Sequence, residues 1–212
     1  MKCHWMYLGG AFGLMFAGPG MAVALSSPLP LLIGLAFGIA CALMWIFHAT
    51  DPDPAHHRVA VSEEELTTAT NRLRWVDQTI AELAAQAQIK PLRAAKLANA
   101  GVYYKPLWHR INISRALLAR LSDADLKLIL AHEIGHATRR CATWASFRES
   151  SRIAEEIRAD AIALRLTGAN KNEWLRAMLA ALRAEDVNGS PREIAARLAA
   201  LGISSTWQGL MI

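Results

Sequence analysis

Residues His132-Glu133-Ile134-Gly135-His136 decide how this sequence is interpreted. On a helix, residues four positions apart project from the same face, so His132 and His136 can bind one metal ion together. A His-Glu-x-x-His pentapeptide is typical of zinc hydrolases, in which the enclosed glutamate lies beside the metal. Because such a pentapeptide also arises by chance, a third metal ligand has to be found elsewhere in the chain.

The residues on either side of this pentapeptide predict a buried helix. Ser122 is a suitable N-cap, acidic residues follow it in the first turn, and Arg139 and Arg140 match the negative end of the helix dipole. Apolar residues occupy the inner positions, namely Leu126, Ile129, Leu130 and Ile134. Burying two histidines and a glutamate on such a helix is costly unless they share a partner, so a metal site is favoured over two structural histidines.

A second acidic motif, Glu156-Ile157-Arg158-Ala159-Asp160, offers the third ligand. Its two outer carboxylates lie four positions apart on a predicted helix, on a face lined with small residues that allow close packing. Glu155 is the alternative ligand, but it projects about 100° away from Glu156 around the helix. We therefore predict that His132, His136 and Glu156 bind one Zn²⁺ ion per chain.

Two short stretches upstream of the metal helix alternate as β-strands do, Val102-Tyr103-Tyr104 and Arg110-Ile111-Asn112-Ile113-Ser114. The second stretch comes shortly before the metal helix, where an edge strand can bind an extended peptide through its backbone. Ile111, Asn112 and Ile113 are therefore predicted as a substrate-binding edge strand. An edge strand with a purely structural role fits the pattern equally well.

The first fifty residues have the composition of a membrane segment. No Asp, Glu, Lys or Arg occurs over residues 3–47, and the helix-breaking sequence Ser26-Ser27-Pro28-Leu29-Pro30 divides this apolar stretch. Residues 1–50 are therefore predicted to form a transmembrane helical hairpin, with spans over about 6–25 and 31–48.

Beyond the hairpin, residues 51–61 predict a stiff linker, and residues 62–212 predict the catalytic domain. Lys2 precedes the first span and Arg58 follows the second, whereas the turn between the spans is uncharged. We therefore expect a multi-pass protein of a bacterial-type inner (cytoplasmic) membrane, with its catalytic domain in the cytoplasm. Ala22-Val23-Ala24 also resembles a signal-peptidase site, so cleavage of the first segment stays an open alternative.

The composition of the 212-residue chain excludes other classes of protein. The net charge of +5 is scattered along helical faces without a basic stripe or aromatic stacking positions, so no nucleic-acid partner is expected. Of the three cysteines, two lie in the apolar front, so a disulfide framework is not expected.

Taken together, the pentapeptide at 132–136 and the following Glu156-Ile157-Arg158-Ala159-Asp160-Ala161 resemble the M48 family of zinc metallopeptidases. This family includes bacterial heat-shock membrane proteases, CAAX prenyl proteases and the mitochondrial stress protease. Residues 111–114 and 117–122 are similar to its edge strand and its approach to the zinc helix, whereas Ser190-Pro191 stands where the family usually has His-Pro. Thermolysin-like gluzincins share the ligand layout, but their longer chains lack a membrane hairpin.

The resemblance implies a mainly helical α+β fold, a zincin-like (gluzincin) domain with a small edge-strand sheet. It implies a membrane-anchored zinc metalloendopeptidase that acts on polypeptides, including membrane proteins in quality control, near the lipid bilayer. Glu133 would be the catalytic base, and Asp160 would orient a ligand histidine, His132. The oxyanion donor stays open; the candidates by chemistry alone are His109, Tyr103, Tyr104 and Arg197. A catalytically silent, zinc-stabilised membrane adaptor is the competing hypothesis, which the intact Glu133 disfavours.

Overall fold

The computed structural model describes residues 32–40, 59–106, 108–139, 149–187 and 190–203 of the chain. The chain divides into two compact units, Met1–Pro52 and Asp53–Ile212, and each is described by itself. The boundary between the units falls within the predicted linker region, close to its start.

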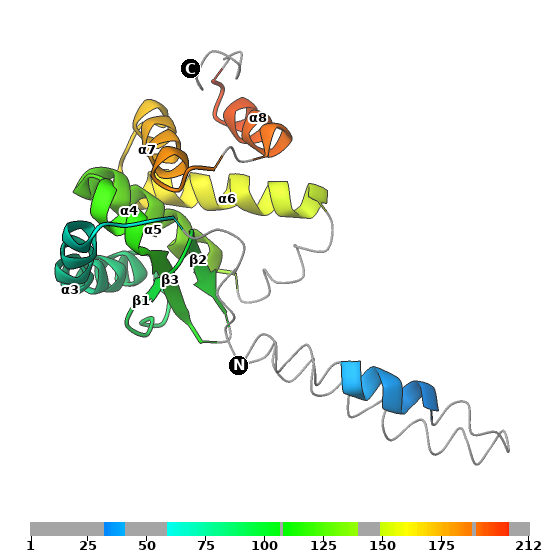
Figure 1. The fold of residues 1–212 in the computed structure, drawn as a ribbon. Coiled ribbons are helices and arrows are strands. Elements are labelled where there is room, and N and C mark those ends of the chain that lie inside the picture. Colours follow the sequence, from blue (N-terminus) through cyan, green and yellow to red (C-terminus); the bar gives the residue numbers. More distant parts are fainter. Residues whose placement is uncertain (1–31, 41–58, 107, 140–148, 188–189, 204–212) are drawn as a thin grey trace, which may run out of the picture. The chain divides into compact units, whose positions relative to one another are not determined.

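In the first unit, residues 32–40 form a helix, drawn in blue in Figure 1. Its two glycines are buried, whereas its large apolar side chains are exposed, namely Leu32, Ile33, Leu35, Phe37 and Ile39. Within the described ranges, no helix is both long and apolar enough to cross a membrane. The span predicted over 6–25 lies outside these ranges, and the one over 31–48 is described only at 32–40.

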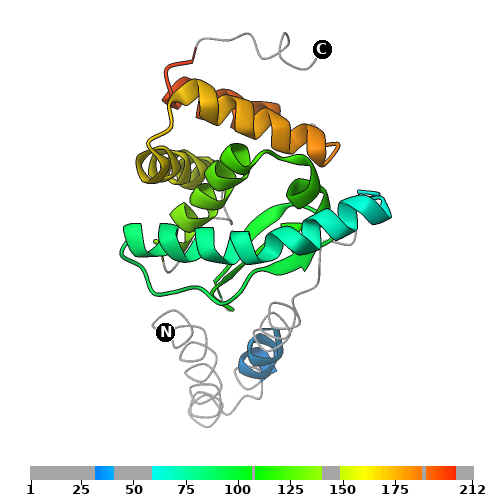
Figure 2. The ribbon, with the colours of Figure 1, turned by 90° about the vertical axis from the view of Figure 1, so that its left-hand side faces the viewer.

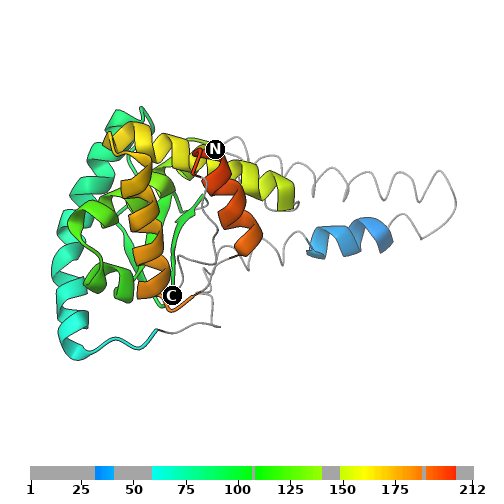
Figure 3. The ribbon, with the colours of Figure 1, turned by 90° about the horizontal axis from the view of Figure 1, so that it is seen from above.

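The second unit is mainly helical with one small sheet, which confirms the α+β class (Figure 1). Its elements, in chain order, are α3 (Glu63–Gln86), β1 (Lys96–Ala98), β2 (Val102–Lys105), β3 (Arg110–Ser114), α4 (Arg115–Arg120), α5 (Asp123–Ala137), α6 (Glu149–Thr167), α7 (Lys171–Ala184) and α8 (Pro191–Ala200). Helix α5, which carries the histidine pair, packs against α3, α6, α7 and strand β2. Figure 2 shows α5 between α3 and α7, and Figure 3 shows α7 and α8 lying over the layer that contains α5 and α6.

The sheet has the order β1-β3-β2, so β3 is its central strand. The prediction that Ile111, Asn112 and Ile113 form a substrate-binding edge strand is therefore wrong. The reason is strand β1, which the sequence did not predict and which pairs in parallel with β3, while β2 pairs with it antiparallel. With both neighbours in place, the backbone of β3 cannot also bind a peptide, and the free edges belong to β1 and β2.

Helix α5 begins as the sequence predicts and crosses α6 very closely. Its N-cap is Ser122, whose hydroxyl oxygen accepts a hydrogen bond from the Asp125 N–H at 3.1 Å. Near its other end, a Cβ placed on Gly135 would lie 2.9 Å from the Ala159 Cα of α6. Ala159 and Ala163 are fully buried, so small residues on both helices allow the backbones to approach. This crossing brings the motif that contains Glu156 onto the histidine pair.

Candidate metal centre

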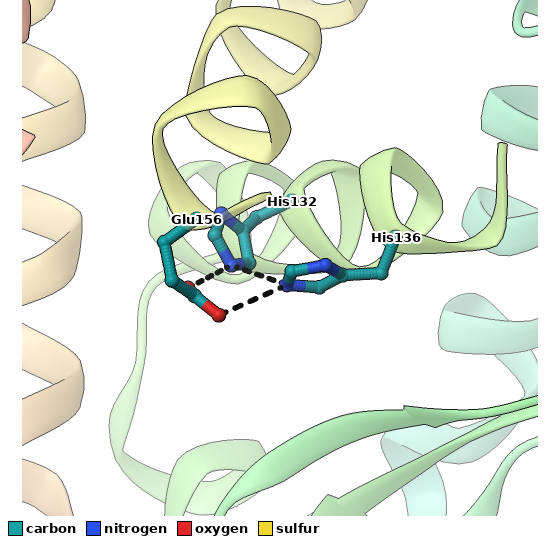
Figure 4. A group of neighbouring side chains, drawn as sticks. All are labelled: His132, His136 and Glu156. Carbon is teal, nitrogen blue, oxygen red and sulfur yellow. Dashed lines mark hydrogen bonds and ion pairs between the residues drawn. The ribbon is translucent and has the colours of Figure 1, made fainter. Parts of the chain in front are cut away.

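Three side chains from two helices converge on one point (Figure 4). The Nε2 atoms of His132 and His136 lie 3.1 Å apart. The carboxylate of Glu156 reaches both rings, at 3.1 Å from the first Nε2 and 3.5 Å from the second. The ligand atoms of all three residues lie within 4.8 Å of one another. The structure thus brings together the three residues predicted as zinc ligands.

The chemistry of these donors fits a zinc ion. At tetrahedral angles and Zn–N distances near 2.0–2.1 Å, two imidazole nitrogens on one zinc ion are separated by roughly 3.3 Å, close to the spacing of the two histidines. A carboxylate oxygen and two imidazole nitrogens facing one another are all electron-rich, so the cluster suits a cation. Two histidines and one carboxylate also leave a tetrahedral site with a fourth position for water or substrate.

His132 is held from behind by Asp160. The Asp160 Oδ1 atom lies 2.8 Å from the Nδ1 atom of the ring, although the ring N–H is not well aligned with that oxygen. Asp160 in turn accepts two hydrogen bonds from Arg197 of α8, at 2.7 and 2.8 Å. Arg197 also contacts Glu156 at 3.3 Å, so α8 supports both a ligand and its partner. The arrangement is that of a metal-binding histidine fixed by a carboxylate.

The local charges make this cluster strongly attractive to positive charge. Burial by itself lowers the pKa of His132, but the carboxylates of Asp160 and Glu156 outweigh it and raise that pKa to about 10. Burial likewise raises the pKa of Glu156, but the two histidines and Arg197 outweigh it and lower that pKa to about 2. A histidine must lose this proton to bind a metal ion, so metal binding at this site would release a proton and depend on pH.

His136 has a carboxylate behind it as well, from Glu155. The Oε1 atom of Glu155 lies 3.5 Å from the Nδ1 atom of His136, and Glu155 is 4% exposed. Arg139 donates to it at 2.9 Å, and Arg158 donates to it and to the carbonyl oxygen of Gly135. The sequence placed Glu155 away from the metal correctly, but its arginine partners were not predicted. Arg158 lies one turn from Glu155 on α6, so helix spacing could have identified it, whereas Arg139 is 16 positions away in sequence and gave no such signal.

Glu133 lies beside the metal-binding groups on the same helix and is 5% exposed. Its Oε2 atom accepts a hydrogen bond of 2.6 Å from the backbone N–H of Tyr104 in β2. Burial is the largest influence on this carboxyl group and raises its pKa, despite the nearby histidines. Burial therefore favours the protonated form of this carboxyl group more than water would.

A cavity of about 400 Å³ adjoins these groups and contains all four of them in its wall. Of the four candidate oxyanion donors, Tyr103, Tyr104 and Arg197 line it, whereas His109 does not. The Tyr104 hydroxyl group lies 2.8 Å from the Nδ1 atom of His109, and burial raises the pKa of Tyr104 to about 12. Tyr104 therefore contributes to the site through its backbone N–H, which donates to Glu133.

Comparison with known families supports the interpretation of this site. Residues 70–150 match the model of peptidase family M48, a range that contains the sheet, α4 and α5 with His132, Glu133 and His136. Glu156 lies beyond the matched range, so its place at the centre rests on geometry. No curated protein and no solved structure matches the chain.

Proposed function

We propose that the chain, whose residues 70–150 match the model of peptidase family M48, is a zinc metalloendopeptidase, which hydrolyses peptide bonds within polypeptides. The observation that carries this proposal is the convergence of His132, His136 and Glu156 beside the buried Glu133. One Zn²⁺ ion per chain is the cofactor that this donor set suits.

The ligands and the base divide the chemistry between them. His132, His136 and Glu156 would hold the zinc ion, which when bound acidifies water and polarises a substrate carbonyl group. Glu133 would accept the proton of the attacking water and then deliver it to the leaving amine. Burial raises the pKa of Glu133, which helps the carboxyl group hold the proton that it takes from water until the amine leaves. The Tyr104 N–H holds one carboxylate oxygen, so we assign the proton transfer to the other, Oε1.

A catalytically silent, zinc-stabilised adaptor is the second candidate function. Such an adaptor needs the three metal-binding side chains but has no use for a base. Glu133 is almost fully buried, its carboxylate is held by a backbone N–H, and it faces the cavity. Keeping a carboxyl group there costs desolvation energy that an adaptor would not recover, so we favour the enzyme.

Proteolysis of casein with and without a zinc chelator tests this proposal. We expect cleavage that stops on chelation and returns when zinc is added. The Glu133→Gln variant should keep its zinc, measured by metal analysis, but lose roughly 10²-fold to 10⁴-fold in proteolysis, as expected for a general base. Cleavage that survives complete removal of zinc would contradict the proposal, and loss of zinc together with activity would give Glu133 a structural role instead.

We further propose that the chain is anchored in the membrane through residues 1–50, with the catalytic domain in the cytoplasm. The uncharged stretch over residues 3–47 supports this, as does the helix at 32–40, whose exposed side chains are large and apolar. Anchoring would restrict the enzyme to chains near the bilayer, which is consistent with a role in membrane-protein quality control.

The position of the C-terminus tests the anchoring. A reporter fused after Ile212 should fluoresce as a green fluorescent protein and be inactive as a periplasmic phosphatase, because two spans return the chain to the cytoplasm. Strong phosphatase activity would show that a single segment spans the membrane and would place the zinc site outside the cytoplasm.

A further inference from the structure

The cavity beside the metal-binding side chains is lined by chemically different groups. The histidine pair, Glu133 and Glu156 are part of its wall. Large apolar side chains of α4, α5 and α7 also line it, namely Leu117, Ile129, Trp174, Met178 and Leu182. A volume of about 400 Å³ is within the range of cavities that hold small ligands, and it is large enough for a bulky side chain.

The polar groups elsewhere in this wall are already bonded inside the protein. Glu185 accepts a hydrogen bond from the Gly101 N–H at 2.9 Å and another from the Ser114 hydroxyl group. Arg197 donates two hydrogen bonds to Asp160 and a longer one to Glu193, and its guanidinium group stacks on the Trp174 ring at 4.9 Å. Because these groups are engaged, a side chain that enters the cavity meets mainly apolar surface.

We infer that this cavity is the specificity pocket of the enzyme and binds a large apolar side chain, from one of the two residues that flank the scissile bond. The inference rests on the proposed peptidase function and adds the class of substrate. A polar or charged side chain would lose its hydration in the cavity without gaining a partner, so the pocket rejects it. An apolar side chain gains from burial, and each methylene that fills such a pocket changes kcat/KM about 10-fold to 200-fold.

Met178 and Leu182 of α7 set the breadth of this preference. Met178 is 6% exposed, and its flexible thioether side chain can fit both aliphatic and aromatic groups. Leu182 is half-buried one turn further along the same face of α7. The pocket therefore accepts Leu, Met and Phe side chains and discriminates against Gly, Ala and charged residues.

Cleavage-site mapping of casein by mass spectrometry tests the inference with the zinc-loaded, full-length protein. We expect Leu, Met and Phe to be enriched at one of the two positions that flank the cleaved bonds. Peptides that differ only at this position should then show kcat/KM at least about 10-fold higher with Leu than with Ala.

Two pocket variants and one matched control sharpen the test. Leu182→Trp narrows the pocket and should shift cleavage toward smaller apolar residues, whereas Met178→Ala widens it and should favour Phe over Leu. Arg183→Ala changes an exposed residue of the same helix outside the cavity wall and should leave the preference unchanged. The preference is a ratio between peptides, so a partial loss of folded protein in either variant does not alter it.

The outcomes separate this inference from the proposed function. Zinc-dependent cleavage without a preference for apolar residues would contradict the inferred specificity pocket. So would pocket variants that cleave the same sites as the wild type. Neither result would contradict the proposed peptidase activity. Enrichment of Lys or Arg would show that ligands meet the Glu185 carboxylate, which also contradicts the inferred specificity pocket. If the zinc-loaded protein cleaved no bond in casein, both the proposed peptidase activity and the inferred specificity pocket would be contradicted.

Discussion

Helices and strands contribute to the metal centre in different ways. Helices α5 and α6 contribute side chains, and His132, His136 and Glu156 meet because the two helices cross closely. Strand β2 contributes its backbone, through the Tyr104 N–H that holds Glu133. The helical part of the site is therefore sensitive to side-chain identity, whereas the strand part is sensitive to where the backbone lies and whether it can donate.

Removing a ligand from the helical part should have the largest effect. Glu156→Ala should weaken zinc binding by more than the roughly 100-fold that marks the upper end for residues behind the ligands. Competition with a chelator of known zinc affinity measures this. The matched control is Glu155→Ala, which removes the neighbouring carboxylate and should retain more zinc. If Glu156→Ala kept full zinc content, the third ligand would lie elsewhere, with Glu155 the first residue to examine.

The next effect concerns the carboxylate behind His132. Asp160→Asn keeps the shape of the side chain but removes its charge, so it should weaken zinc binding about 10-fold to 100-fold. Chelator competition again measures it, alongside the unfolding of the metal-free protein. An equal loss of zinc in Arg197→Gln would indicate that Arg197 acts by holding Asp160. Unchanged zinc affinity in Asp160→Asn would show that His132 needs no such support.

The helix crossing itself can be tested at Gly135. Alanine is the better helix former, so Gly135→Ala would stabilise an isolated α5. In this protein the new Cβ would meet the Ala159 Cα at 2.9 Å and its carbonyl oxygen at 3.0 Å, so we expect destabilisation by about 1–3 kcal/mol in denaturant unfolding. Adding Ala159→Gly should restore little, because the closest atoms belong to the backbone. Full restoration would show that only the side chain of Ala159 limits the approach.

The contrast between the helical and strand parts of the site also explains which of its features could be predicted from the sequence. Helix periodicity relates neighbouring residues, so the shared face of His132 and His136 followed from spacing, and the choice of Glu156 over Glu155 followed from spacing together with the small residues on the same face. The order of strands depends on pairing between distant segments. Strand β1 has three residues without clear alternation, and it turned the predicted edge strand at 111–113 into the centre of the sheet.

Contacts between residues that are distant in sequence are a second feature that the sequence could not predict. Arg197 was considered only as an oxyanion donor. In the structure it lies on α8 and donates two hydrogen bonds to Asp160 of α6. Two further contacts join α6 to the end of α5 in the same way: Arg139 donates to Glu155, and Arg158 donates to the carbonyl oxygen of Gly135. Surface arginines and buried arginines look alike in a sequence, so their partners emerge only when the helices are packed.

The smallest effect, and the only one that tests the strand part alone, is expected for Tyr104→Pro. The Ser114 N–H donates to the Gly101 carbonyl oxygen at 2.8 Å, and the antiparallel register alternates from there, so the N–H of Tyr104 points away from β3. Proline is tolerated at such an edge position, so the substitution removes the donor to Glu133 and spares the ladder. A hydrogen bond to a charged group contributes about 1.5–3 kcal/mol, and water can replace part of it. We therefore expect kcat/KM to fall about tenfold.

Tyr104→Ala and Tyr104→Phe are the controls for this variant, because both keep the backbone donor and lose the hydroxyl group that contacts His109. Zinc content should be unchanged in all three, since none of them alters a ligand. If Tyr104→Ala lost as much activity as Tyr104→Pro, the side chain rather than the backbone of β2 would support Glu133. The contrast between the helical and strand parts of the site would then disappear, because both would act through side chains.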